Sequence, residues 1–391
     1  RFEGGDGDDE ARDGDQTYSK PDPAGKGDTW IMGDGDDYVG GSGGDEHIEL
    51  GGGDDDGALW KDVVGTIYLD MGPGDDAFDS SSGDQTVIGG PGDDTLATAA
   101  GVKDIDMGDG DDYVQVSSGG RSKRTLLGPG NDGFSSSSGT TADDVVDGGP
   151  GDDVISTGEG KDTITDVEGA NTLNGGEGDD TITSGPGNDE VRGQGGNDTL
   201  VDHGNDRGAR GTSTDGQQRL WGGDGDDTIT QTGATLPGTT QDSVTGDGGK
   251  DVIKTAGGSQ NIQGGDGNDD LDAGAGDDTV NGGNDDDVVR GGEGDDWVSG
   301  GFTGNNTLYG GPGADRIEGG DGKDTVSYAD RTAPVSVSIG IGSYDDGNAT
   351  DDSANTPGKR DDLAYTVETV IGTELDDVIR VGSIGSSATG D

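Results

Sequence analysis

Aspartates that recur at intervals of nine and eighteen residues are the side chains of this chain that could do chemistry. Four nine-residue units follow one another without a gap from Gly264 to Ser299, and the sixth residue of each is an acid: Asp269, Asp278, Asp287 and Asp296. Calcium and magnesium prefer carboxylate and carbonyl oxygens as ligands. The chain has no Cys and only His47 and His203, which excludes a zinc site built from those residue types. The spacing therefore predicts a row of sites for a divalent cation.

The sixth position of the repeat supplies further candidate ligands along the chain. We predict as metal ligands Asp76, Asp94, Asp112, Asp144, Asp153, Asp162, Asp180, Asp189, Asp198, Asp227, Asp251, Asp269, Asp278, Asp287, Asp296, Asp315 and Asp324. At Asp132 and Asp242 a ligand and a solvated carboxylate are equally good interpretations. Asp9, Asp37 and Asp45 are weaker candidates because the repeats beside them are irregular.

The elements that must position these acids follow from the rest of each repeat. Six glycine-rich residues predict a turn, and three residues predict a strand in which alternation points the eighth residue inward. Asp76, Asp94 and Asp112 are 18 residues apart, which indicates that two nonapeptides form one coil of a solenoid. The units between them, at Gln85 and Lys103, keep an apolar eighth residue but lack the acid. We expect one buried aliphatic side chain per repeat, and therefore a thin core.

The composition implies that such a core does not stabilise the fold by itself. The chain has 87 Gly in 391 residues, 25% hydrophobic residues and a formal net charge of −61. Chains of this kind do not bury enough apolar surface to offset an ordering entropy of roughly 1–2 kcal/mol per residue. A bound cation would supply the missing free energy and screen stacked carboxylates that otherwise repel one another. We expect folding and metal loading to be one transition.

The repeats match the pattern GGxGxDxUx, where U is a large aliphatic residue, and so the chain resembles the RTX, or haemolysin-type, calcium-binding repeat family. That resemblance implies an all-β, right-handed parallel β-roll with calcium between successive turns on the same side. It implies multiple Ca²⁺ ions, on the order of 8–15. Where Gln85, Lys103 or Asn171 replaces the acid, the resemblance implies an incomplete site.

Three regions are expected. Residues 1–30 form an irregular N-terminal segment or cap, and residues 31–326 form the roll. Irregular spacing predicts insertions near residues 202–212 and 231–236. Residues 327–391 form a small C-terminal β cap or tail with strands at Val335–Ile341 and Leu363–Ile371.

Several function classes can be weighed from the sequence. GGSGG at Gly40–Gly44 formally matches the G-x-S-x-G motif of hydrolases, but a glycine repeat produces that match by chance, and we predict no enzymatic activity. The acidic charge argues against nucleic-acid binding, and no apolar stretch is long enough to span a membrane.

The first hypothesis is an extracellular structural protein, a calcium-rigidified rod at the cell surface or in a matrix, with possible head-to-tail assembly of copies into filaments. The second is a calcium-responsive folding segment of a larger secreted protein. The third is a surface that binds ice or crystals through outward threonine rows. All three place the chain outside the cell.

Overall fold

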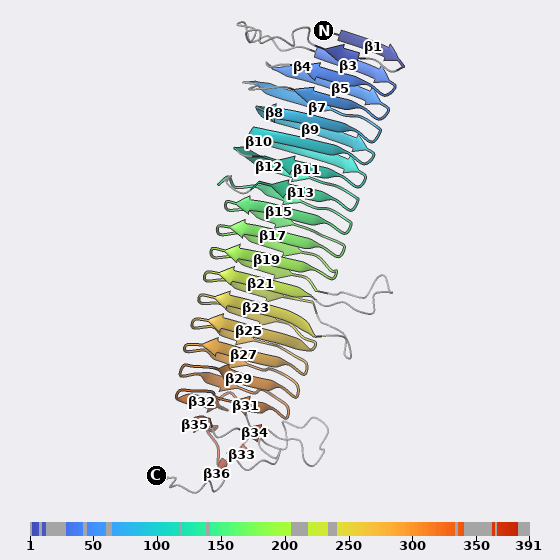
Figure 1. Cartoon of the computed structure of the whole chain (residues 1–391). Helices are drawn as coiled ribbons and strands as arrows, with labels where there is room; N and C mark the ends of the chain where they lie inside the picture. The colour runs from blue at the N-terminus through green and yellow to red at the C-terminus, as the bar shows by residue number, and fades with distance from the viewer. Residues whose placement is uncertain are drawn as a thin grey trace. The chain divides into compact units, whose positions relative to one another are not determined.

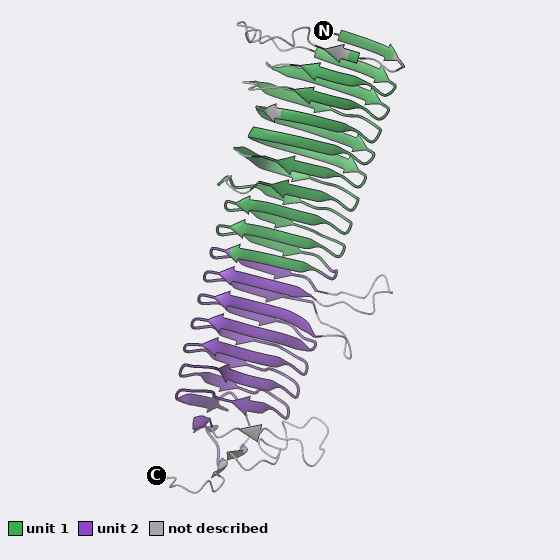
Figure 2. Cartoon of the chain, in the orientation of Figure 1, with its two compact units in different colours: residues 1–185, 189–194 green, residues 186–188, 195–391 purple. Residues whose placement is uncertain are grey.

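The computed structural model describes residues 2–7, 10–12, 29–41, 45–59, 65–117, 119–137, 141–204, 218–233, 241–332, 335–339, 362–363 and 366–381. All regular secondary structure in these residues is β-strand, and they contain no helix that could cross a membrane (Figure 1). The chain divides into two compact units. The first comprises Arg1–Gly185 and Asp189–Gln194, and the second comprises Pro186–Asn188 and Gly195–Asp391 (Figure 2).

The first unit is a parallel β-roll with two sheets, here called A and B. Sheet A consists of β1 (Phe2–Asp6), β3 (Thr29–Asp34), β5 (Glu46–Gly52), β7 (Thr66–Asp70), β9 (Asp84–Pro91), β12 (Gly120–Leu126), β14 (Val145–Asp147), β16 (Thr163–Thr165) and β18 (Thr181–Ser184). Sheet B consists of β2 (Glu10–Arg12), β4 (Tyr38–Gly41), β6 (Asp56–Leu59), β8 (Ala77–Ser82), β11 (Tyr113–Val116), β13 (Gly133–Ser136), β15 (Val154–Glu159), β17 (Thr172–Glu177) and β19 (Glu190–Gly195). The long strand β10 (Thr95–Asp109) pairs first in sheet B and then in sheet A.

The second unit repeats this architecture. Its sheet A consists of β20 (Thr199–Asp202), β22 (Thr228–Gln231), β24 (Val252–Thr255), β26 (Asp270–Asp272), β28 (Val288–Arg290), β30 (Thr307–Tyr309), β32 (Asp324–Ser327) and β35 (Val367–Ile371). Its sheet B consists of β21 (Arg219–Asp224), β23 (Asp242–Gly248), β25 (Gln260–Asp266), β27 (Thr279–Asn284), β29 (Trp297–Gly301), β31 (Arg316–Glu318), β34 (Asp362–Leu363), β33 (Ser336–Ile339) and β36 (Val378–Val381). The parallel β-roll that the repeats predict is thereby confirmed.

In regular parts of both sheets, each residue pairs with the residue 18 positions later in the chain. Ile164 of β16 pairs with Ile182 of β18, and Leu271 of β26 pairs with Val289 of β28. These eighth residues are fully buried in the core between the sheets. Each residue therefore packs on its equivalent one coil away, as the repeat requires.

The core contains a second inward position that the repeat pattern did not reveal. Strands such as β22 and β24 extend one residue past the predicted three, so the first residue of the next repeat also points inward. At this position Met71, Met107 and Leu127 are fully buried. The core is consequently thicker than one aliphatic side chain per repeat.

Glycines allow the turns to stack closely. Gly267 has φ +127°, and a Cβ atom built on it would overlap the carbonyl oxygen of Gly249 in the preceding coil. Only glycine adopts this backbone conformation readily while leaving room for the neighbouring main chain.

Both ends of the chain contain strands. Strand β1 pairs in register with β3 and lies within the expected irregular N-terminal segment or cap. Strands β33 and β35 occur within the two expected C-terminal segments, and β36 lies beyond them. Most of the two predicted insertions, near residues 202–212 and 231–236, lies outside the described residues.

Candidate metal centres

The sixth residue of each repeat lies where a turn enters a strand, and its side chain points into the roll. We call the row of turns that precede sheet A strands edge A, and the row that precede sheet B strands edge B. Every aspartate predicted as a ligand is at most 3% exposed. Buried carboxylates are rare unless they are paired with a cation or with donors, so the environment of these side chains decides what they can bind.

One oxygen of each such carboxylate joins neighbouring coils. In edge B of the first unit, Asp94 Oδ1 accepts the backbone N–H of Asp76 at 2.9 Å, and Asp112 Oδ1 accepts that of Asp94 at 2.8 Å. In edge A of the second unit, Asp269 and Asp287 each accept the N–H of the acid one coil earlier. Oδ1 therefore has a structural role and fixes the direction of the second oxygen.

The second oxygen, Oδ2, is buried without a hydrogen-bond donor at many of these positions. Within the described residues this holds for Asp76, Asp94, Asp112, Asp227, Asp251, Asp269, Asp278, Asp287, Asp296 and Asp324. A buried acceptor that lacks a donor costs about 1–3 kcal/mol, and more when it carries charge. The fold therefore maintains a row of oxygen atoms whose partner must come from outside the polypeptide.

Main-chain oxygens face the same gaps. A Cβ built on Gly246 would overlap Asp251 Oδ2 and would lie 2.6 Å from the carbonyl oxygen of Gly264 in the next coil. The missing side chain of glycine thus leaves a space lined by carboxylate and carbonyl oxygens. Calcium takes six to eight such ligands at 2.3–2.6 Å, and this donor set fits it.

The carboxylates are distributed one per turn along the edges. Among the described residues, no group of three or more Asp, Glu, His or Cys side chains is placed to hold one ion. A cation in these gaps would take most of its ligands from the main chain. That favours calcium, which accepts carbonyl oxygens in flexible geometry, over a transition metal.

The buried aspartates at the sixth positions form a ladder along each edge. In the metal-free roll, burial raises the pKa of these ladder carboxyl groups. Desolvation and, secondarily, the neighbouring acids raise the pKa of Asp76 and Asp94 to about 7, and burial raises that of Asp287 and Asp296 to about 8. The backbone N–H bonds to Oδ1 oppose this shift. Near neutral pH each group therefore needs a proton or a cation to stay buried.

The structure adds acids to the ladder that the sequence placed poorly. Asp37, Asp132 and Asp242 are buried at sixth positions, so the solvated interpretation of Asp132 and Asp242 is wrong. Asp55 also belongs to the ladder, because its Oδ1 accepts the N–H of Asp37 at 2.7 Å. The sequence pattern did not identify Asp55 because Gly57 stands where the repeat has an aliphatic residue. The ring of Phe78 in the next coil fills that space.

Two weaker candidates have other outcomes. Asp45 is exposed and accepts the N–H of Thr66 at 2.8 Å, while Glu46 takes the buried position and accepts a hydrogen bond from Trp30 Nε1. Asp9 lies outside the described residues.

Lys103 replaces the acid with a cation of the chain itself. This side chain is fully buried, and its Nζ donates to the carbonyl oxygens of Gly83 at 2.7 Å and Ala100 at 3.2 Å. Burial lowers its pKa to about 8, and the charge of Asp84 opposes that shift. One ammonium group thus satisfies carbonyl oxygens in two successive coils.

The coil at Asn171 contains a buried acid that the motif does not specify. Asp166, the first residue of that repeat, is 1% exposed, and its Oδ1 accepts a hydrogen bond from Asn171 Nδ2 at 2.6 Å. Desolvation and the nearby carboxylate of Asp153 raise the pKa of Asp166. Nothing in the nonapeptide pattern marks this position as acidic.

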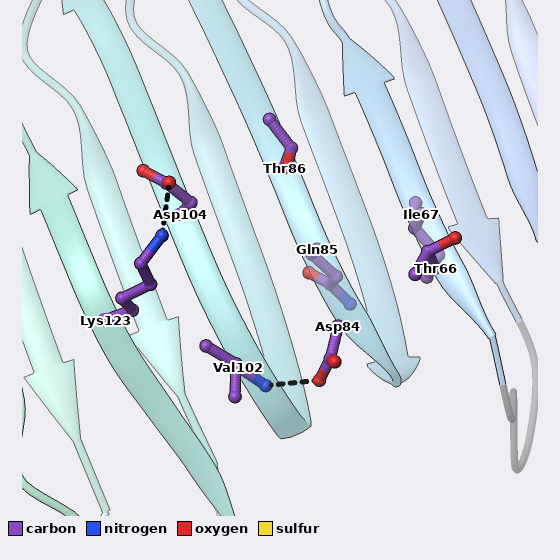
Figure 3. A pocket seen from close by; sticks show the side chains of 8 residues that line it. All are labelled: Thr66, Ile67, Asp84, Gln85, Thr86, Val102, Asp104 and Lys123. Carbon is purple, nitrogen blue, oxygen red and sulfur yellow. Dashed lines mark hydrogen bonds and ion pairs between the residues drawn. The ribbon is translucent and has the colours of Figure 1, made fainter.

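A shallow cavity of about 190 Å³ lies on sheet A of the first unit (Figure 3). At its rim Lys123 Nζ contacts Asp104 Oδ2 at 3.3 Å, and Asp84 Oδ1 accepts the N–H of Val102 at 2.9 Å. Thr66, Ile67, Gln85 and Thr86 complete the lining. These residues provide neither a nucleophile paired with a base nor a cluster of metal ligands.

Comparison with known families agrees with this geometry. A family model described as the RTX calcium-binding nonapeptide repeat (four copies) matches residues 72–102, 79–114, 129–165, 167–200, 212–230, 255–289, 263–298 and 300–330. Together these matches cover more than half of the chain. No curated protein matches it.

Proposed function

Because the chain belongs to the family of RTX calcium-binding nonapeptide-repeat proteins, we propose that it is an extracellular structural protein whose roll forms and stiffens when calcium binds. The observation that carries the proposal is the row of buried Oδ2 atoms that lack a donor and face turn carbonyls. Each bound ion would link two successive coils, so ligand binding and chain ordering would be the same event.

Calcium supply supports a location outside the cell. Extracellular calcium modules typically bind with dissociation constants of about 10⁻⁴ to 10⁻³ M, which matches calcium outside a cell and leaves such sites empty within it. Proteins with RTX repeats are typically secreted. Secretion in an unfolded state followed by folding outside would use this difference in calcium concentration.

The ladder residues are proposed as the calcium ligands, with Asp251, Asp269 and Asp287 as a central example. Each has Oδ1 engaged with the preceding coil and Oδ2 without a donor. Proposed sites at the other predicted aspartates follow the same logic. The proposal assigns no enzymatic activity to this chain, because the same calcium-ligand role is proposed for the buried aspartate of each repeat.

Assembly into filaments is a further part of the proposal. Strands at the two ends of a parallel roll have unpaired edges that can template another copy of the chain. Head-to-tail contacts of this kind do not close and would propagate. Calcium would both form the coils and reduce repulsion between copies with a formal net charge of −61.

The main alternative is that the roll is the calcium-responsive folding segment of a larger secreted protein. Both functions use the same sites, and only the presence of a catalytic or adhesive neighbour separates them. The ice-binding alternative has less support: Thr163 and Thr165 stack on Thr181 and Thr183, but in the adjacent strand β14 the paired residues are Val145 and Asp147.

Circular dichroism during a calcium titration, combined with light scattering after size-exclusion chromatography, tests the proposal. We expect a disordered monomer in chelator, a β spectrum in millimolar calcium and an increase in mass with protein concentration. A β spectrum that calcium does not change would refute the calcium-dependent roll. A monomer of 39.0 kDa at every concentration would refute filament assembly alone.

A further inference from the structure

The coil at Asn171 departs from the repeat in two places at once. Its sixth residue is an amide, which removes the usual carboxylate. Its first residue is Asp166, whereas the same position is Gly148 one coil earlier along edge B and Gly175 in the next repeat of the chain. In some repeats this first position is a glycine that leaves room for Oδ2 of the sixth residue, as at Gly175 beside Asp180, and in others it carries a buried uncharged side chain such as Met71. In the coil of Asn171, the carboxylate of Asp166 at the first position occupies the space that the sixth-position carboxylate takes in other repeats.

The geometry directs the relocated carboxylate toward the preceding coil. A Cβ built on Gly148 would lie 2.6 Å from Asp153 Oδ2 and closer still to Asp166 Oδ2. The two oxygen atoms thus converge on one point beside a residue without a side chain. Apart from a hydrogen bond that the two carboxyl groups can share with each other, neither Oδ2 receives a bond from a donor group in the described residues. Both side chains are at most 1% exposed, so water does not solvate them.

Asn171 holds this arrangement in place. Its Oδ1 accepts the backbone N–H of Asp153 at 2.9 Å, as the aspartate of a standard repeat would. Its Nδ2 donates to Asp166 Oδ1 at 2.6 Å and leaves Asp166 Oδ2 free to face Asp153. The Asn171 amide therefore keeps the hydrogen bond to the preceding coil and orients the carboxylate of Asp166.

Asn306 in the second unit provides a natural comparison. It is also an asparagine at the sixth position, but the first residue of its repeat is Gly300. There Nδ2 lies in the gap, 2.5 Å from where a Cβ of Gly300 would be, and donates to Asp324 Oδ1 at 3.0 Å. An amide donor repels a cation. Loss of the acid is thus uncompensated at Asn306 and compensated at Asn171.

We propose that Asp166 and Asp153 form an additional calcium site, in which the carboxylate lost from position six is supplied from position one. Two buried carboxylate oxygens that face each other require positive charge between them, and a divalent ion supplies it while using the turn carbonyls as further ligands. This inference rests on the proposed calcium-dependent roll. It reverses the expectation that the coil at Asn171 has no complete site.

Ion counting in the full chain tests the inference. Calcium-saturated protein would be freed of unbound ion by gel filtration and its calcium content measured per chain. We expect D166G, which introduces the glycine that the repeat of Asp153 has at its first position, to bind one ion fewer than the wild-type chain. E168Q is the matched control, because Glu168 is an exposed acid two residues away and its loss should not change the count.

The double variant D166G/N171D separates this site from a folding defect. It moves the acid back to position six, so we expect a folded chain with the wild-type calcium count. If no ion binds at Asp166, D166G will leave the count unchanged and the double variant will gain one ion; that result overturns the inference in favour of a proton shared by Asp153 and Asp166. A wild-type chain that binds no calcium at all would instead refute the proposed function.

Discussion

Asp251 and Asp269 are joined across one coil by a 2.8 Å hydrogen bond from the backbone N–H of the first to Oδ1 of the second. The same carboxyl group of Asp269 keeps Oδ2 buried without a donor. A single side chain thus combines a contact that the polypeptide completes with one that it does not. The two oxygens can be tested separately by substitution.

Replacing Asp269 with Asn should preserve the bond to Asp251 and abolish cation binding at Oδ2, as the natural amide at Asn306 suggests. We expect the calcium concentration at the midpoint of folding to rise several-fold, for a loss of about 1–3 kcal/mol. Calcium titration followed by circular dichroism measures this shift. Asp321→Asn removes the same charge from an exposed turn position and should shift the midpoint little; equal shifts for both variants would mean that only net charge matters.

Removal of calcium should unfold the chain, and magnesium should restore it poorly. The gaps offer carbonyl oxygens at many positions, which calcium accepts, whereas magnesium demands compact octahedral geometry and retains water. We expect a β spectrum in millimolar calcium and a disordered spectrum in the same concentration of magnesium. Equal refolding by the two ions would show that charge screening alone drives the transition.

Protons should partly substitute for calcium. The folded-state pKa is raised from 3.8 to about 7 at Asp94 and to about 8 at Asp287, mainly by burial. The metal-free roll therefore binds more protons than the unfolded chain, and the resulting stabilisation is fully present below pH 3.8 and lost as the pH rises through about 7 to 8.

Protein stripped of calcium on a chelating resin should accordingly show more β structure at about pH 5 than at about pH 8. With calcium present the order should reverse at limiting calcium, because protons compete with the ion for Oδ2. Circular dichroism across this pH range decides the matter. A metal-free chain that loses structure on acidification would contradict the pKa directions.

Lys103→Ala should destabilise the roll without changing its calcium count. The substitution removes an ammonium group that donates to Gly83 and Ala100 and leaves their carbonyl oxygens buried, at a cost of about 1–3 kcal/mol. Denaturant unfolding in saturating calcium measures it. Lys123→Ala deletes a lysine that is 61% exposed and pairs with Asp104, and it should cost less than about 1 kcal/mol.

The sequence predicts the repeated part of this structure because period and chemistry coincide there. Asp269 is recognised as a buried acid since Leu271 follows at the aliphatic position and the next coil repeats both. Asp55 escapes the same reasoning because Gly57 stands in the aliphatic position, and the compensation by Phe78 comes from another coil. The pattern of a single repeat does not show that a side chain from the neighbouring coil fills the space of its missing aliphatic residue.

The position-one side chains were missed for a related reason. Met71 and Asp166 occupy equivalent places, yet one extends the apolar core and the other places charge in the metal gap. Nothing local distinguishes an inward residue there from a turn residue, because strand length depends on pairing with the neighbouring coil. The ligand role of each aspartate remains a prediction that ion counting and crystals grown in calcium will test.

The unbroken strand β10 gives the first unit a place where order can begin. From Thr95 to Asp109 the chain passes from sheet B to sheet A as one continuous strand. The positive charge in this region is Lys103, a side chain of the protein itself. In a repeat protein, folding starts wherever the first coil is easiest to form and then spreads to its neighbours. We expect β10 to be that seed: on edge A its coil needs no ion from solution, so the remaining coils can add to an existing template as calcium becomes available.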